Sequence, residues 1–134
     1  MEKQKLAEEQ RQEIVLVAIY LLSQYGKKEE VSHSALVDCL TEIQKEITLG
    51  YEFAKKLPYY SYELSEDLND LWLHKRYIRR YKYRSPLLPK NFVGLWPLGR
   101  GHAKKVVETL DPEMFEVLNK AVRTIIKKGG KNGK

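Results

Sequence analysis

The sequence predicts a mainly α-helical protein with a small β-ribbon, which places it in the α+β class. Helical spacing of apolar residues covers much of the chain on both sides of a central segment. That segment, 77–98, contains two strand-like runs around a Pro-containing turn. A length of 134 residues, of which 43% are hydrophobic, is enough for one domain with a core and too short for two comfortable ones. We predict a single domain over 1–128 and a disordered basic tail over 129–134.

The first element is a long helix over residues 3–25, closed by Gly26. Its second half, 14–22, is apolar on every side. Such a helix must be covered on more than one face. In a chain of this size, that favours either a central helix or a subunit interface.

The second helix follows a turn over 26–30 and extends to about Glu46, with Ser32 or Ser34 as its N-cap. The apolar residues that share one face at helical spacing are Leu36, Val37, Leu40, Ile43 and Ile47. Cys39 lies off the centre of that stripe, which favours a small packing residue over a nucleophile. Residues 48–60 are ambiguous, with a short strand or turn at 51–53.

The third helix, 61–74, has three stripes at about 100° per residue. The stripe predicted to be buried contains Leu64, Leu68, Leu71 and Trp72. The second stripe is wholly acidic and contains Glu63, Glu66, Asp67 and Asp70. The third contains Tyr62, Ser65, Asn69, Leu73 and Arg76. Acidic residues early and basic residues late also suit the helix dipole, so the carboxylates need no functional explanation.

A basic ribbon follows, with strands over 77–84 and 92–98 and a turn over 85–91. Alternation puts Arg79 on one face and Arg80 on the other. The return strand is expected to end at residues 99–101, which read Gly-Arg-Gly. A helix followed by a two-stranded basic ribbon is the layout of a winged helix, here with additional N- and C-terminal helices.

Two more helices complete the chain. Ala103, Val106, Val107 and Leu110 indicate a short one. Asp111 and Pro112 then begin another, in which Phe115, Leu118, Val122 and Ile125 form a seam of coiled-coil type. The seam and the apolar first helix predict a homodimer, but packing of the seam on the protein's own first helix explains it equally well.

Charge is distributed unevenly. Residues 1–74 carry 8 basic and 14 acidic residues, whereas residues 75–134 carry 16 basic and 4 acidic ones. Between Lys75 and Lys105 there are ten basic residues and no acidic one. A block of one sign attracts a polyanion or an acidic partner surface, although a solvated face with a basic tail is an equally open interpretation.

Catalytic, metal-binding and cofactor-binding patterns are not found. Three histidines, His33, His74 and His102, have no partner at ligand spacing, and Cys39 does not complete a zinc set. The glycines are too sparse for a phosphate loop. The longest apolar run, nine residues, is too short to cross a bilayer, and a single cysteine permits no internal disulfide. We expect a cytoplasmic protein that is not an enzyme and has no cofactor, metal or membrane partner.

Residues 58–71, followed by Tyr77 and Ile78, resemble winged-helix proteins. The pattern is similar to that of small, poorly characterised YwgA-like proteins of bacteria and archaea. In those proteins an aromatic element precedes the turn, and Tyr51 and Phe53 occupy its place in this chain. Residues 96–102 occupy the place of the end of the wing and of the Gly-led helix that follows it. The resemblance covers about half the chain and implies the fold, with DNA binding and transcription regulation as expectations from a class that contains many regulators.

The first functional hypothesis is therefore a homodimeric winged helix that binds double-stranded DNA. The side chains expected to contact phosphates are Arg79, Arg80, Lys82, Arg84, Arg100, Lys104 and Lys105. Those expected to reach base edges are Ser65, Asn69 and Arg76. The acidic stripe argues against groove binding unless it points away along the groove or pairs with the wing's own arginines. Without such pairing, weakly specific contact through the wing is the favoured form.

The second hypothesis is a protein-interaction winged helix, adaptor-like or antitoxin-like. In this interpretation the acidic helix and the tyrosines Tyr59, Tyr60 and Tyr62 meet a partner protein. We place DNA binding ahead of it.

Overall fold

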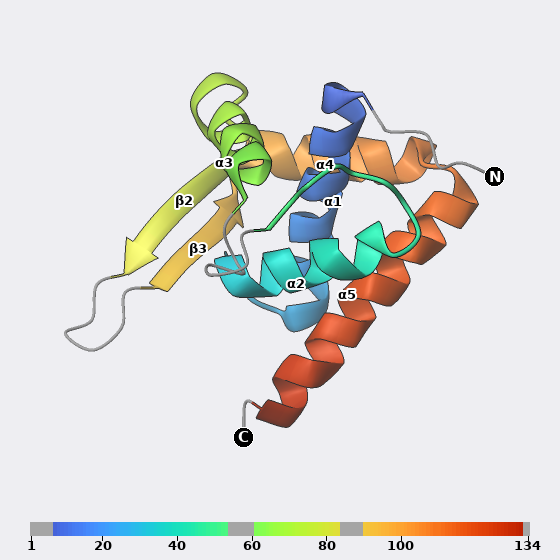
Figure 1. Ribbon diagram of the computed structural model, residues 1–134. Helices are drawn as coiled ribbons and strands as arrows, with labels where there is room; N and C mark the ends of the chain where they lie inside the picture. The colour runs from blue at the N-terminus through green and yellow to red at the C-terminus, as the bar shows by residue number, and fades with distance from the viewer. Residues whose placement is uncertain (1–6, 54–60, 84–89, 133–134) are drawn as a thin grey trace.

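The computed structural model describes residues 7–53, 61–83 and 90–132. At 81–83, 90 and 129–132 it describes the backbone alone. It is mainly helical with a small antiparallel sheet, as predicted (Figure 1). The elements are α1 (Glu8–Gly26), β1 (Glu30–Ser32), α2 (His33–Gln44), α3 (Tyr62–Asn69), the π-helix η1 (Asp70–His74), β2 (Ile78–Tyr83), β3 (Lys90–Leu95), α4 (Pro97–Thr109) and α5 (Pro112–Asn132).

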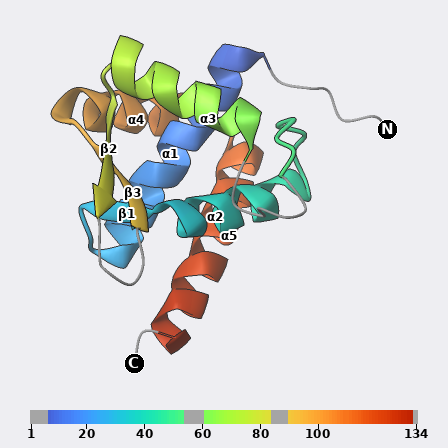
Figure 2. The ribbon, with the colours of Figure 1, turned by 60° about the vertical axis from the view of Figure 1, so that its left-hand side comes forward.

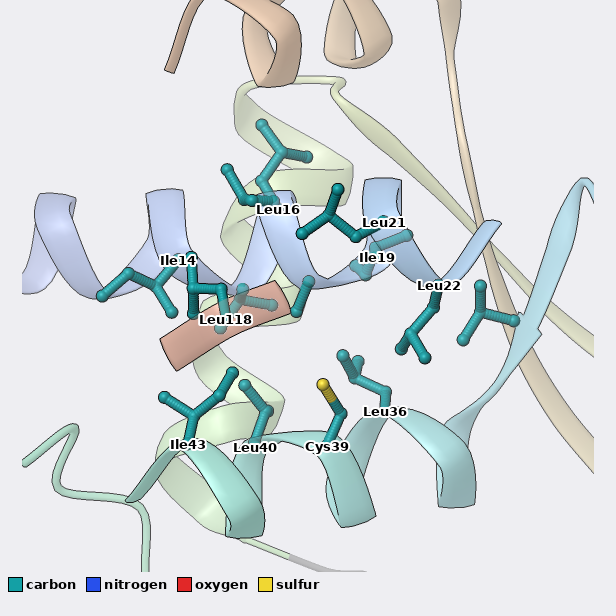
Figure 3. Close-up of a cluster of buried hydrophobic side chains, with 14 of the residues drawn as sticks. Ile14, Leu16, Ile19, Leu21, Leu22, Leu36, Cys39, Leu40, Ile43 and Leu118 are labelled. Carbon is teal, nitrogen blue, oxygen red and sulfur yellow. The ribbon is translucent and has the colours of Figure 1, made fainter. Parts of the chain in front are cut away.

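Helix α1 is the centre of the fold, in agreement with one of the two predicted alternatives. Residues 14–19 of α1 are almost fully buried, because α2, α4, α5 and the sheet all pack around the helix. Figure 3 shows side chains of α1 and α2 directed toward one another, with Leu118 of α5 beside them. The helix ends one residue later than predicted. Gly26 is its last residue, and Lys27 adopts the left-handed conformation (φ 54°), where its N–H binds the Gln24 and Ser23 carbonyls.

Helix α2 begins at the predicted cap. The Ser32 hydroxyl accepts a hydrogen bond from the Ala35 N–H at 3.1 Å. Four of the five predicted apolar positions are buried, and Ile47 is partly buried because α2 ends at Gln44 and not at Glu46. Cys39 is fully buried in the core, which agrees with its interpretation as a packing residue.

The sheet has three strands in the order β1-β3-β2, all antiparallel. Where β1 lies, the sequence indicated the end of a turn and a helix cap. The strand was not predicted, because three residues are too few to show alternation. It forms by pairing with β3, where Val31 lies opposite Val93.

The predicted end of the return strand is wrong. Strand β3 stops at Leu95, and residues 99–101 lie inside α4 and not after a strand. The reason is Pro97, the first residue of α4. Proline has no backbone N–H, and the N–H at this position has no hydrogen-bond partner within a helix, so proline is well suited to begin one.

Helix α5 lies diagonally across α1 and α2 (Figure 1). The predicted seam is internal, because Leu118, Val122 and Ile125 are buried by these two helices of the same chain. The tail predicted to be disordered is instead helical as far as Asn132, since each added residue extends a hydrogen-bonded helix that already exists. Both observations that suggested a homodimer are thus satisfied within one chain, and the dimer stays a prediction. Among the described residues, no helix is both long and apolar enough to span a membrane.

Candidate interaction surface

Helix α3 and η1 form the outermost layer beside the ribbon. In Figure 2 they cross the top of the molecule, with α1 beneath them. Ser61 caps α3 by accepting a hydrogen bond from the Leu64 N–H at 3.3 Å. Leu64, Leu68 and Leu71 are buried, as predicted. Trp72 lies at the edge of this stripe and is not buried, with 37% of its surface exposed. Arg80 of the ribbon covers one face of its ring.

Asp67, predicted to belong to an exposed acidic stripe, is 1% exposed. Its carboxylate accepts two hydrogen bonds from the Arg11 guanidinium, at 2.7 and 2.9 Å. Gln12 Nε2 donates to it at 3.2 Å, and the Tyr51 hydroxyl at 2.5 Å. Burial, followed by the bond to Asp67, raises the pKa of Tyr51, so the hydroxyl remains a donor. The prediction for Asp67 was wrong because its partners come from distant parts of the chain.

The other three carboxylates are also engaged locally. Asp70 Oδ1 lies 2.9 Å from His74 Nδ1. Glu63 accepts hydrogen bonds from its own N–H, from the Ser61 hydroxyl and from the Glu52 N–H, and these bonds lower the pKa of Glu63. Glu66 is exposed and accepts a hydrogen bond from the Tyr62 hydroxyl at 3.3 Å. The acidic stripe is therefore one buried anchor and three surface groups, of which only Glu66 is highly exposed.

The two described arginines of the wing lie against different tryptophans. The Arg79 guanidinium lies 4.7 Å from the centre of the Trp96 ring. Arg80 lies 5.9 Å from the centre of the Trp72 ring and donates to Asn69 Oδ1 at 2.6 Å. Burial lowers the pKa of Arg80. The alternation predicted from the sequence separates these arginines, and their contacts are inside the molecule.

Four other predicted contact residues are differently placed. Arg76 is exposed in the left-handed conformation (φ 57°), while Arg100, Lys104 and Lys105 lie on α4. None of these four cations forms an ion pair within the described part of the chain. Ser65 is partly exposed on α3. The Lys82 side chain and all of Arg84 lie outside the described residues.

The base of the ribbon is closed by a contact that the sequence did not indicate. The Trp96 N–H donates to the Tyr77 carbonyl at 3.0 Å. Gly99 approaches the same carbonyl so closely that a Cβ there would lie 1.9 Å from its oxygen. Tyr77 stacks on His102 with ring centres 4.8 Å apart, and His102 Nε2 lies 3.4 Å from Glu13. The start of α4 is thereby fixed against Tyr77, the residue before β2, and against α1.

A partly apolar face remains on the solvent side of α3 and η1. We define this outer face as Tyr62, Ser65, Glu66, Asn69, Trp72 and Leu73, which share one side of the helix. Tyr62 is 63% exposed and Leu73 is 56% exposed. The sequence pattern placed Tyr62 and Leu73 on one stripe but did not show how much of each side chain stays exposed.

A hollow of about 640 Å³ lies among α1, β1, α2 and α5. Leu22, Val31 and Ile125 contribute apolar surface to it. Its charged lining residues are Lys28, Glu30, Asp38 and Lys128. Burial raises the pKa of Asp38. Both signs of charge therefore occur around the hollow, so its net charge does not indicate a class of ligand.

Comparison with family models, with curated proteins and with solved structures found no match to this chain. Within 7–53, 61–83 and 90–132, no group of three or more His, Cys, Asp or Glu side chains is arranged to hold a metal ion.

Proposed function

We propose that the chain is a winged helix. The order from α1 to β3 is helix, strand, helix, helix, strand, strand, with η1 extending the third helix. The sheet order β1-β3-β2 places the ribbon at one edge of a helical core. This order, and the position of α3 beside the ribbon, support the assignment.

We further propose that the protein binds double-stranded DNA through its phosphates, as a regulator-like module. The observation that carries this proposal is the segment from Lys75 to Lys105, which has ten basic residues and no acidic one. Arg76, Arg100, Lys104 and Lys105 have no internal carboxylate partner among the described residues, so their charge is available to an external anion. Lys82 and Arg84 remain proposed contacts of the wing.

Arg80 and Asn69 leave the proposed contact set, because they bind each other. Without Asn69, α3 loses the side chain best suited to reading adenine. Its outer face also presents Glu66 and the apolar Leu73, neither of which suits a groove lined by phosphates. The proposed binding is therefore weakly sequence-specific and does not depend on α3 in the major groove.

The test is the affinity for random duplex DNA as a function of salt. Each phosphate contact contributes a slope of about −0.9 in log affinity against log salt. We expect the triple charge reversal Arg76→Glu, Lys104→Glu and Lys105→Glu to reduce both the affinity at low salt and the slope.

The matched control reverses the same number of charges on α5, with Lys120→Glu, Lys127→Glu and Lys128→Glu. It changes the net charge equally but leaves the proposed surface intact, so it should bind nearly as well as the wild type. Equal loss in both variants would mean that net charge alone acts. A wild-type protein that does not bind even at low salt would overturn the proposal.

The exposed Tyr62, Trp72 and Leu73 favour a second function, the docking of a protein on the outer face. Of the tyrosines first assigned to such a role, Tyr59 and Tyr60 lie outside the described residues. The acidic helix contributes less than predicted, since Asp67 is internal.

A further inference from the structure

We propose that the outer face of α3 and η1 binds a second copy of this chain, with the two helices antiparallel across a two-fold axis. The proposal concerns the protein without DNA and does not depend on the DNA-binding function. It differs from the predicted dimer, because the first helix and the α5 seam are occupied within one chain.

The first argument is apolar exposure. In the described part of the chain, the large hydrophobic side chains that remain exposed are Tyr62, Trp72, Leu73, Trp96 and Leu98. Three of these five share the outer face. Single exposed hydrophobic residues are ordinary on a protein surface, whereas several on one face indicate an interface.

The second argument is charge. On its exposed side, the N-terminal half of this helical segment carries Glu66, and exposed Arg76 follows its C-terminal end. Lys75 is directed toward α1 instead, with its Nζ 2.7 Å from Gln12 Oε1. A two-fold axis across the face turns the second copy end to end, which brings the acidic half of each copy toward the basic end of the other. The face is thus complementary to itself. A nucleic acid would be repelled by one half, and a partner of one charge sign would match only the other half.

The third argument is rigidity. The inner side of α3 is tied to α1 by the Asp67–Arg11 bonds. The outer side is tied to the ribbon by the bond from Arg80 to Asn69, and Arg80 also covers Trp72. A face that is already ordered loses less conformational entropy when it associates.

The main experiment is sedimentation equilibrium of the full chain, without DNA, from about 1 to 100 μM, a range suited to micromolar association. We expect the wild type to dimerise. Leu73→Asp should weaken the association about tenfold or more, because it puts a charge into the apolar part of the contact. Leu98→Asp is the matched control: Leu98 is similarly exposed, at 62% against 56%, but lies on α4, so its variant should associate like the wild type.

A charge exchange tests the antiparallel arrangement. Glu66→Arg and Arg76→Glu should each weaken self-association, since each places like charges opposite one another. An equimolar mixture of the two variants should associate more tightly than either alone, because both contacts between positions 66 and 76 in the mixed dimer then join opposite charges.

Three results would overturn the proposal. One is a monomeric wild type over the whole concentration range. Another is a dimer that Leu73→Asp leaves intact or that only Leu98→Asp disrupts. The third is a mixture of charge variants that associates no better than its components. Circular dichroism of each variant ensures that a loss of association is not a loss of folding.

Discussion

Helices α1 and α3 both carry apolar residues beyond a single narrow stripe, but the fold treats them in opposite ways. Around α1, the rest of the chain supplies cover on every side, and residues 14–19 are almost completely buried. Around α3 and η1, the described residues bury the inner side and reach the outer side through Arg80, which leaves Tyr62 and Leu73 more than half exposed. An apolar helix is therefore evidence for a partner only where its own chain does not pack against it.

The same contrast exists between the two sides of α3. On its inner side a carboxylate, Asp67, is buried and receives hydrogen bonds from Arg11, Gln12 and Tyr51. On its outer side another carboxylate, Glu66, is exposed and accepts one bond from Tyr62. Two acidic residues adjacent in sequence thus serve different purposes, one in holding the helix and one in shaping its surface.

Replacement of Asp67 should give the largest effect on stability. Asp67→Ala leaves the Arg11 guanidinium partly buried without its carboxylate, a change that typically costs about 3–5 kcal/mol. Glu66→Ala, one residue earlier, should change stability by less than about 0.5 kcal/mol. Urea unfolding followed by circular dichroism measures both. Similar losses for the two variants would contradict the distinction between the two sides of the helix.

A pair of leucines sharpens the comparison between α1 and η1. Leu16 is 0% exposed, so Leu16→Ala should cost about 2–5 kcal/mol through lost packing and a residual cavity. Leu73 is 56% exposed, so Leu73→Ala should alter the stability of the monomer by less than about 0.5 kcal/mol. The measurement is again urea unfolding, at protein concentrations low enough to exclude association. A large cost for Leu73→Ala would show that η1 needs this side chain within one chain.

Cys39 gives the smallest effect, a difference in reactivity. Burial, with smaller contributions from Glu42 and Asp38, raises the pKa of the Cys39 thiol to about 12. Because only the thiolate reacts, the folded protein should resist a thiol reagent at pH 8 and react after denaturation. The raised pKa also means that the folded state loses stability as the pH rises above the ordinary thiol value of about 8.5 toward 12. Rapid labelling of the native protein would contradict the burial of this thiol.

Local patterns predicted the elements that have local causes. The Ser32 cap, the buried leucines of α3 and the start of α5 at Pro112 each depend on residues within a few positions. Strand β1 was missed because only its pairing with β3, some sixty residues away, makes it a strand. The boundary between β3 and α4 was misplaced because Trp96 and Pro97 also fit an apolar strand.

The candidate site was predicted less well, and for the same reason. Alternation along β2 predicts that Arg79 and Arg80 lie on opposite faces. Only the folded chain brings Trp96 to Arg79, and Trp72 and Asn69 to Arg80. The burial of Asp67 depends on Arg11, 56 positions away, and on Tyr51. A charged residue in a regular acidic stripe carries no local sign of such an ion pair.

Gly99 gives a way of recognising relatives of this chain where overall similarity fails. No residue with a side chain fits opposite the Tyr77 carbonyl, because even a methyl group would overlap its oxygen. A Cβ added to Gly101 would meet no atom within 4 Å, so other residues fit at that position. A distant homologue that keeps this junction must therefore keep a glycine at position 99, even when every surface charge has changed. This glycine lies three residues after Trp96, whose N–H closes the base of the ribbon.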